Sequence, residues 1–197
     1  MGLSSVIAGT TEQRSELEAL SLGNPFLEPQ GNPFLEPHWY AAYTCANHEK
    51  RVAGELRARE VEHFLPLHSS VRRWKDRRVQ LDLPLFPGYV FVHLAAQERL
   101  RVLQVPGVVR LVGVNGSPSP MPEEDIDRIR EFLGRGWHAE PHPYLQAGRR
   151  ARVVRGPLAG MEGIVVRRKN RSRLVVSFEL IQRSMAIEMD EGDLAAI

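Results

Sequence analysis

RVVRGPLAGMEGIVVRRK, residues 152–169, is a turn segment between two β-branched runs. Its proline presets the backbone angle for a turn, and Gly160 and Gly163 supply positions where a side chain would clash. We expect Leu158 and Met161 at the tip of the turn, where large apolar side chains have no core to enter. Exposed apolar groups on a rigid turn favour docking to a protein over binding of phosphate.

Short strand candidates continue from this stretch to the end of the chain. They are separated by turn signals and show no helical periodicity. The candidates are ARVVR, GIVVRR, RLVVSFE, SMAIEM and DLAAI. Five short strands in about 50 residues predict a small β-barrel over residues 149–197.

The chain before the barrel alternates strand and helix patterns. Aromatic and β-branched residues predict strands at 39–44 and 86–94. A helix is expected within residues 48–61, and another from Pro122, followed by three acids that suit a helix start. The alternation predicts an α/β sandwich, a sheet with helices packed on it. Residues 135–148, rich in Gly, Pro and His, predict an interdomain linker.

The two helices have distinct expected faces. Val52, Leu56 and the stems of Arg59 and Glu60 mark one face of the first, with Glu49, Arg51, Glu55 and Arg57 elsewhere. In the second helix the expected buried stripe consists of Ile126, Ile129 and Leu133.

Residues 1–37 contain the tandem octapeptide GNPFLEPQ-GNPFLEPH. Two prolines per octapeptide forbid a regular helix or a central strand, so we expect an extended, disordered leader. A linear docking motif built on its two Phe-Leu pairs is one interpretation, and a duplicated linker is the one we favour.

Charge is segregated along the chain although the formal net charge is only +2. Residues 149–183 hold ten basic and two acidic residues. A second basic cluster surrounds Trp74 and consists of Arg72, Arg73, Lys75, Arg77 and Arg78. Several bases together allow salt-sensitive contacts with nontemplate DNA or an upstream duplex, and a solvated hairpin is the alternative. For the bases at 167–173 we favour a charged turn.

Little in the sequence favours catalysis, a cofactor or a metal. There is no Gly-rich phosphate loop, and His138 and His142 are separated by Pro141, which breaks a helix. The lone Cys45 cannot form an internal disulfide, and no signal peptide or membrane-spanning run is present. We expect a soluble, cytoplasmic protein that is not an enzyme.

Several segments together resemble a known family. VVRGPLAGMEGIVV looks like a KOW motif, and WYAAYTCANHEKRV, LFPGYVFVHL, VPGVVRLVG and PMPEEDIDRI resemble the N-terminal (NGN) domain of the NusG family of bacterial transcription elongation factors. The resemblance covers about residues 38–197. It implies an α+β protein with an NGN domain at 38–134, an antiparallel sheet with flanking helices, followed by an SH3-like KOW barrel.

The resemblance also implies a function and a contact surface. The NGN domain would bind the clamp helices of the large RNA polymerase subunit through a hydrophobic concavity and suppress pausing or termination. The matching positions are Trp39, Tyr40, Tyr43, Phe86, Pro87, Gly88, Tyr89, Pro106 and Val108. The tyrosines favour partner contact because they pair an apolar ring with a polar tip, whereas Trp39 and Phe86 suit a core equally well.

For the barrel the resemblance implies docking to a small-subunit ribosomal protein or to Rho through Leu158, Met161 and Ile181. General NusG sequences usually have an aromatic residue in this turn, so Rho is the less favoured partner. The segments around residues 140–148 and 179–188 look more like specialised antiterminators of polysaccharide operons. A monomer is expected. The alternative function is a ribosome-associated or RNA-binding KOW protein.

Overall fold

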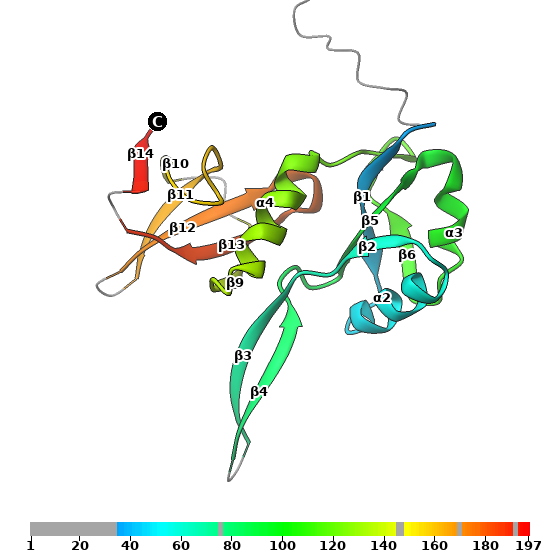
Figure 1. Cartoon of the computed structure of the whole chain (residues 1–197), viewed down its shortest axis with the longest axis horizontal. Helices are drawn as coiled ribbons and strands as arrows, with labels where there is room; N and C mark the ends of the chain where they lie inside the picture. Colours follow the sequence, from blue (N-terminus) through cyan, green and yellow to red (C-terminus); the bar gives the residue numbers. More distant parts are fainter. Residues whose placement is uncertain (1–34, 75–76, 145–147, 169–170, 191–192) are drawn as a thin grey trace, which may run out of the picture. The chain divides into compact units, whose positions relative to one another are not determined.

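A computed structural model of the chain describes residues 35–74, 77–144, 148–168, 171–190 and 193–197 (Figure 1). These residues lie within one compact unit, Pro33–Ile197. The fold is α+β, with two antiparallel sheets of four and six strands, a two-stranded ribbon and a small hairpin. The predicted fold class is therefore confirmed. Most of the predicted leader, residues 1–34, lies outside the described residues.

The four-stranded sheet has the strand order β2-β5-β1-β6, and each neighbouring pair is antiparallel. Its strands are β1 (Pro37–Thr44), β2 (Glu62–Phe64), β5 (Tyr89–Ala95) and β6 (Val108–Leu111). The central strands β1 and β5 hold the aromatic and β-branched residues that favour a pleated, buried surface.

Side chains alternate between the two faces of this sheet because successive residues of a strand point in opposite directions. Tyr40 and Val90 join one buried cluster, together with Val52 and Leu56 of helix α2 (Glu49–Ala58). Their neighbours along the strands, among them Trp39, Tyr89 and Phe91, join a second cluster on the opposite face. The sheet therefore separates two cores.

The other helices are α3 (Arg99–Leu103), which follows the short 3-10 helix η1 (Ala96–Glu98), and α4 (Glu123–Gly134). Pro122 takes the N-cap of α4 rather than its first turn, where three acids stand as predicted. The buried stripe of α4 is Ile126, Ile129 and Phe132, and Leu133 is only half-buried. The predicted end of the stripe was thus wrong by one position.

Strands β3 (Leu67–Trp74) and β4 (Arg77–Pro84) pair only with each other and form the ribbon that projects from the rest of the fold in Figure 1. A small hairpin follows β6. It pairs β7 (Gly113–Val114) with β8 (Ser117–Pro118), and Val112 separates it from β6.

The six-stranded sheet has the order β14-β10-β11-β12-β13-β9. Five of its strands match the five predicted candidates: β10 (Arg149–Val153), β11 (Glu162–Arg168), β12 (Arg171–Phe178), β13 (Arg183–Glu188) and β14 (Leu194–Ala196). The 3-10 helix η2 (Glu179–Ile181) joins β12 to β13. The sixth strand, β9 (Ala139–His142), lies in the segment predicted as a linker and pairs with β13. These six strands are called the C-terminal β domain.

Candidate functional site

Aromatic rings gather on the face of the four-stranded sheet that lies opposite α2. We call this surface the aromatic face; its members are Trp39, Tyr43, Phe64, Phe86, Tyr89 and Phe91. The rings of Tyr43 and Tyr89 are 5.5 Å apart, and the Phe86 ring meets Phe91 edge-on at 5.7 Å. Large rings in mutual contact form a surface typical of protein interfaces as well as of cores.

The turn that leads into β5 sets the direction of Phe86. Gly88 has φ +87°, a left-handed conformation, and a Cβ there would lie 3.4 Å from the Tyr43 ring. The carbonyl of Gly88 accepts a hydrogen bond from the N–H of Thr44 at 2.8 Å. Its own N–H donates to the Glu49 carboxylate at 2.7 Å. The turn is therefore fixed on both sides of one glycine.

Glu49 was missed as a functional candidate because sequence periodicity placed it away from the buried side of its helix. Its side chain is only 5% exposed, and the hydrogen bond joins residues that are 39 positions apart. Only the fold brings α2 and the turn together.

The C-terminal β domain covers part of the aromatic face. The ring of Phe178 meets Phe86 edge-on at 5.2 Å, and the guanidinium of Arg183 lies 5.5 Å from the centre of the Tyr89 ring. Buried side chains of both surfaces form one continuous cluster, which includes Ile181. The cover thus consists of ring contacts and a cation–π contact, both of which can be remade with another protein.

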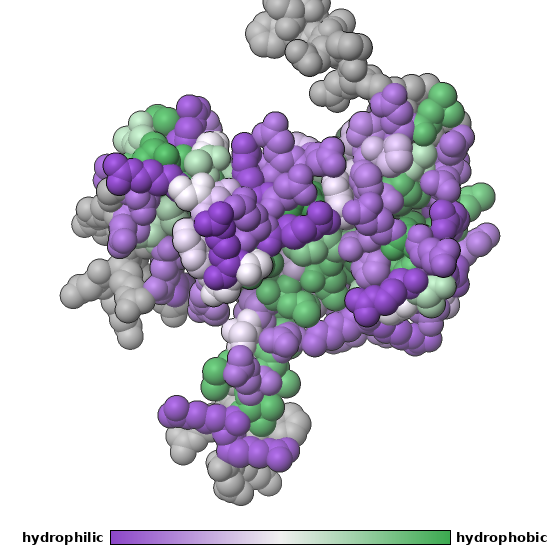
Figure 2. Space-filling model, viewed as in Figure 1, coloured by the Kyte–Doolittle hydropathy of each residue, from purple (hydrophilic) through white to green (hydrophobic). Residues whose placement is uncertain are grey.

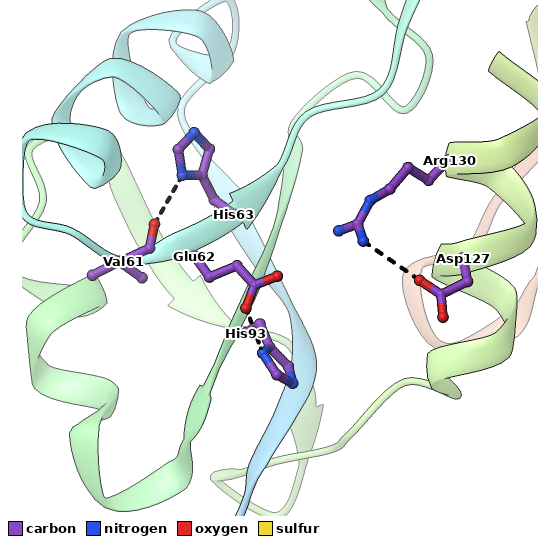
Figure 3. A network of polar contacts seen from close by, with 6 residues as sticks. All are labelled: Val61, Glu62, His63, His93, Asp127 and Arg130. Carbon is purple, nitrogen blue, oxygen red and sulfur yellow. Dashed lines mark hydrogen bonds and ion pairs between the residues drawn. The ribbon is translucent and has the colours of Figure 1, made fainter. Parts of the chain in front are cut away.

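Helix α4 covers another part of the aromatic face. The guanidinium of Arg130 lies 5.2 Å from the centre of the Trp39 ring and 5.3 Å from that of Phe64. Figure 3 shows Arg130 reaching from α4 toward the sheet, on which Glu62 and His93 are joined at 2.8 Å. Charged groups therefore border the rings here.

In the turn at residues 155–161 the two large apolar side chains are buried, whereas most of the other residues are exposed. Leu158 is 1% exposed and Met161 5% exposed, so the expectation that they have no core to enter was wrong. A Cβ at Gly156 would lie 3.4 Å from the Trp137 ring, and one at Gly160 would lie 3.5 Å from Arg128 of α4. Leu158 and Met161 instead belong to the same buried cluster as Ile129 and Phe132 of α4.

Glycine is required at two positions of this turn for different physical reasons. Gly160 has φ +88°, which an L side chain rarely adopts. At Gly163 the reason is steric as predicted, because a Cβ would lie 2.6 Å from the carbonyl oxygen of Val175.

Arg173 of β12 forms ion pairs that connect β9 to the other strands of the C-terminal β domain. This guanidinium binds the carboxylates of Glu140 at 2.8 Å and Glu188 at 3.1 Å. Burial raises the pKa of Glu140, but the hydrogen bond and charge of Arg173, together with His138, outweigh it and leave the pKa below its ordinary value. The ionised form of Glu140 thus supports the position of β9.

A cavity of about 740 Å³ lies at the base of the ribbon. Its lining includes Glu49, His68, His138 and Glu140. Burial, aided by the charge of His138, lowers the pKa of His68, whereas Glu140 acts in the opposite direction. Within the described ranges, no group of three or more His, Cys, Asp or Glu residues could hold a metal ion.

The basic cluster lies on the far part of the ribbon. Arg77 and Arg78 are exposed on β4, opposite Trp74 and Arg73 of β3. Lys75 and the side chains of Arg72 and Arg73 lie outside the described residues. In Figure 2 hydrophilic side chains lie toward the end of the ribbon and hydrophobic ones nearer its base.

The nine positions expected to contact polymerase do not share one surface. Trp39, Tyr43, Phe86 and Tyr89 lie together on the aromatic face, with Gly88 beside Tyr43 and Pro87 exposed at the turn. Tyr40, 1% exposed, and Val108 pack instead in the cluster that contains α2. Pro106 is exposed on the loop before β6.

Sequence reasoning also passed over Phe64, Arg130, Phe178 and Arg183. Each comes close to the aromatic face only through the fold, and no local spacing marks it. Among the described residues, no helix is long and apolar enough to cross a membrane.

Comparisons with known proteins agree on one family. The family model described as transcription termination factor nusG matches residues 37–130. The chain is 28% identical over 139 residues to a transcription termination/antitermination protein NusG of Helicobacter pylori, covering 64% of this chain and 79% of that protein. The NusG of Deinococcus radiodurans is 26% identical over 185 residues, or 80% of this chain and 97% of its own length.

A solved structure shows the same fold. It is described as "Domain interaction in Thermotoga maritima NusG" and aligns with a TM-score of 0.58 and 18% identity, covering 82% of this chain and 98% of its own. Over residues 37–130, the chain is therefore similar to the NusG family of transcription termination and antitermination factors.

Proposed function

We propose that this chain is a transcription elongation and antitermination factor that binds the clamp helices of RNA polymerase through its aromatic face. The observation that carries the proposal is the cover of that face. Phe86 and Tyr89 are buried by Phe178 and Arg183 of the C-terminal β domain, through contacts that a protein partner could replace.

The residue types of the aromatic face support this proposal. Tryptophan and tyrosine are enriched among residues that dominate binding energy, since they bury large rings and keep a polar atom for solvent or partner. Trp39, Tyr43, Phe86 and Tyr89 are the contacts that we propose, with Pro87 and Gly88 shaping the edge. Tyr40 and Val108 are better explained as supports from the opposite core.

While the C-terminal β domain covers the aromatic face, neither polymerase nor a partner of the C-terminal β domain can reach its proposed binding surface. Leu158, Met161 and Ile181, proposed to dock a second partner, are buried in the same cluster as the aromatic face. Separation of residues 38–134 from residues 149–197 would therefore release both surfaces together. A protein whose binding-competent state is only partly populated binds more weakly in proportion to that population.

The second partner that we propose for the C-terminal β domain is a small-subunit ribosomal protein, with Rho less favoured. Rho is less favoured because Leu158 and Met161 stand where an aromatic residue is usual, and the segments around residues 140–148 and 179–188 underlie our inference of a specialised antiterminator. In this proposal residues 135–148 connect the two domains, and β9 returns part of that connection to the barrel.

Nontemplate DNA is the proposed ligand of the ribbon. Arg77 and Arg78 are exposed beside each other on β4, and the sequence adds Arg72, Arg73 and Lys75. A two-stranded ribbon with several bases can follow a phosphate backbone by charge alone.

The test is binding of the full chain to bacterial RNA polymerase core, combined with a pause-escape assay on a long template. Phe178→Ala should uncover the aromatic face and strengthen binding, whereas Phe86→Ala should weaken it. Val109→Ala, an exposed residue of β6, is the matched control. No binding by the Phe178→Ala chain, with retention on ribosomes or structured RNA, would instead support the ribosome-associated alternative.

A further inference from the structure

We infer that Glu49 is a positioning residue, whose carboxylate sets the turn at Phe86–Gly88 and so orients Phe86 and Tyr89 for partner binding. This inference rests on the proposed function. Helix α2 does not contribute a ring to the aromatic face. In this inference it nevertheless controls the shape of that face through Glu49.

The contact is specific and part-buried. Glu49 stands in the first turn of α2, and its Oε1 accepts the N–H of Gly88 at 2.7 Å. On the other side of the same residue, the carbonyl of Gly88 accepts the N–H of Thr44 at 2.8 Å. Both backbone groups of Gly88 are thus hydrogen-bonded: its N–H to α2 and its carbonyl to the end of β1.

Gly88 needs such an acceptor because of its backbone conformation. At φ +87° it lies in the left-handed region directly before β5, next to the Tyr43 ring. A buried N–H without a partner is strongly unfavourable, and a hydrogen bond to a carboxylate is stronger than one to a neutral acceptor. Loss of the Glu49 oxygen would favour a different peptide orientation.

That orientation is transmitted to the rings on either side. The N–H of Tyr89 donates to the carbonyl of Phe86 at 3.1 Å, which closes the turn around Gly88. Rotation of the Gly88 peptide would therefore move Phe86 and Tyr89 together. Both rings contact the C-terminal β domain now and are proposed to contact polymerase after it leaves.

A role in helix capping alone does not explain this arrangement. Acids at a helix start stabilise it while remaining in solvent, as Glu123 and Glu124 do on α4, where both are exposed. Glu49 is buried instead, and its recorded partner lies 39 residues away.

The test compares Glu49→Gln, Glu49→Asp and Glu49→Ala in full chains that also carry Phe178→Ala, which removes part of the cover. Three quantities are measured: the amide exchange rate of Gly88, the affinity for RNA polymerase core, and the melting temperature. Glu55→Ala, on the same helix, is the matched control. Glutamine keeps an acceptor oxygen at the same reach, whereas aspartate is one methylene shorter.

We expect Glu49→Gln to retain slow exchange at Gly88 and an affinity within about threefold of the parent chain. Glu49→Asp and Glu49→Ala should expose the Gly88 amide and weaken polymerase binding by about tenfold or more. Glu55→Ala should change neither the exchange rate of Gly88 nor the affinity for polymerase. Rescue by glutamine and not by aspartate is the result that a general loss of stability does not produce.

Unchanged exchange at Gly88 in Glu49→Ala overturns the inference. It is also overturned if exchange rises while polymerase affinity is unchanged, or if affinity merely follows melting temperature in all variants, glutamine included. If the parent chain does not bind polymerase, the proposed function fails. The exchange rate of Gly88 and the ring contacts of Phe86 with Phe91 and of Tyr89 with Tyr43 would still decide whether Glu49 sets the turn.

Discussion

The two faces of the four-stranded sheet are built from alternate residues of the same strands, yet they differ in what covers them. The face toward α2 is packed with Val52, Leu56 and Val90 around the single ring of Tyr40. The aromatic face is instead covered by α4 and the C-terminal β domain, with arginines over its rings. The first is a core of aliphatic side chains, and the second has the composition of an interface.

The difference separates residues that serve folding from those that we propose for partner binding. An aliphatic cluster gains nothing from exposure, because every side chain in it would lose burial without gaining a polar contact. A ring bordered by a guanidinium of its own sheet, as Tyr43 is by Arg110 at 5.7 Å, keeps a polar neighbour when its cover leaves. The following predictions test this division, beginning with the largest expected effect.

Tyr40→Ala should have the largest effect on stability. Tyr40 is fully enclosed in the cluster with α2, so truncation should lower the free energy of unfolding by about 3–5 kcal/mol. Tyr43→Ala, on the partly exposed opposite side of the same strand, should lower it by about 1 kcal/mol. Urea unfolding of both variants measures the difference. Equal losses for the two would contradict the division between faces.

Phe178→Ala tests whether the C-terminal β domain can separate from the aromatic face. Removing the ring that meets Phe86 should strengthen polymerase binding by about tenfold, because a larger fraction of chains exposes the aromatic face. Titration of polymerase core with the variant measures this, and circular dichroism checks that the strands persist. Val154→Ala, exposed on the same domain, should leave affinity unchanged. Weaker binding by Phe178→Ala would show that the ring itself contacts the partner.

The division between faces also shows how far sequence reasoning could reach. The strands at 39–44, 86–94 and in the last 49 residues were predictable because β-branched and aromatic runs are local signals. Strand β9 was not, because Pro141 and its neighbours resemble a linker. It forms because β13 offers an unpaired edge and Glu140 meets Arg173.

The site was predictable only in part for a related reason. Tyr40 was grouped with Tyr43 by residue type, although an odd separation along a strand places two side chains on opposite faces. Leu158 and Met161 were expected in solvent because nothing in their own segment reveals that α4 will cover them. Contacts between distant segments decide both cases, and local pattern does not contain them.

The ribbon belongs to neither face, so its variants should leave both stability and polymerase affinity largely unchanged. Arg77→Ala with Arg78→Ala should reduce the slope of log affinity against log salt for single-stranded DNA by about 1.4, or roughly 0.7 per lost phosphate contact. The measurement is fluorescence anisotropy over a salt series. Arg57→Ala with Arg99→Ala, both exposed elsewhere, is the control pair. A slope that stays the same in the ribbon variant would rule out phosphate contacts by these two residues.

The smallest effect on stability is expected from the ion pair between Glu140 of β9 and Arg173. Because Arg173 holds the pKa of Glu140 below its ordinary value, the folded chain binds this proton less readily than the unfolded chain. The stabilisation from Glu140 is therefore fully present above the ordinary pKa of a glutamate and is lost as pH falls through the lowered value. The side chain is 40% exposed, so solvent screening limits the contribution to under about 1 kcal/mol.

Glu140→Gln should accordingly unfold at a lower urea concentration than the parent chain at pH 6, and the two should converge at pH 3. Glu179→Gln, an exposed acid of the same β domain, should follow the parent at both values. If the deficit of Glu140→Gln persisted at pH 3, its cause would be packing of β9 and not the charge on Glu140.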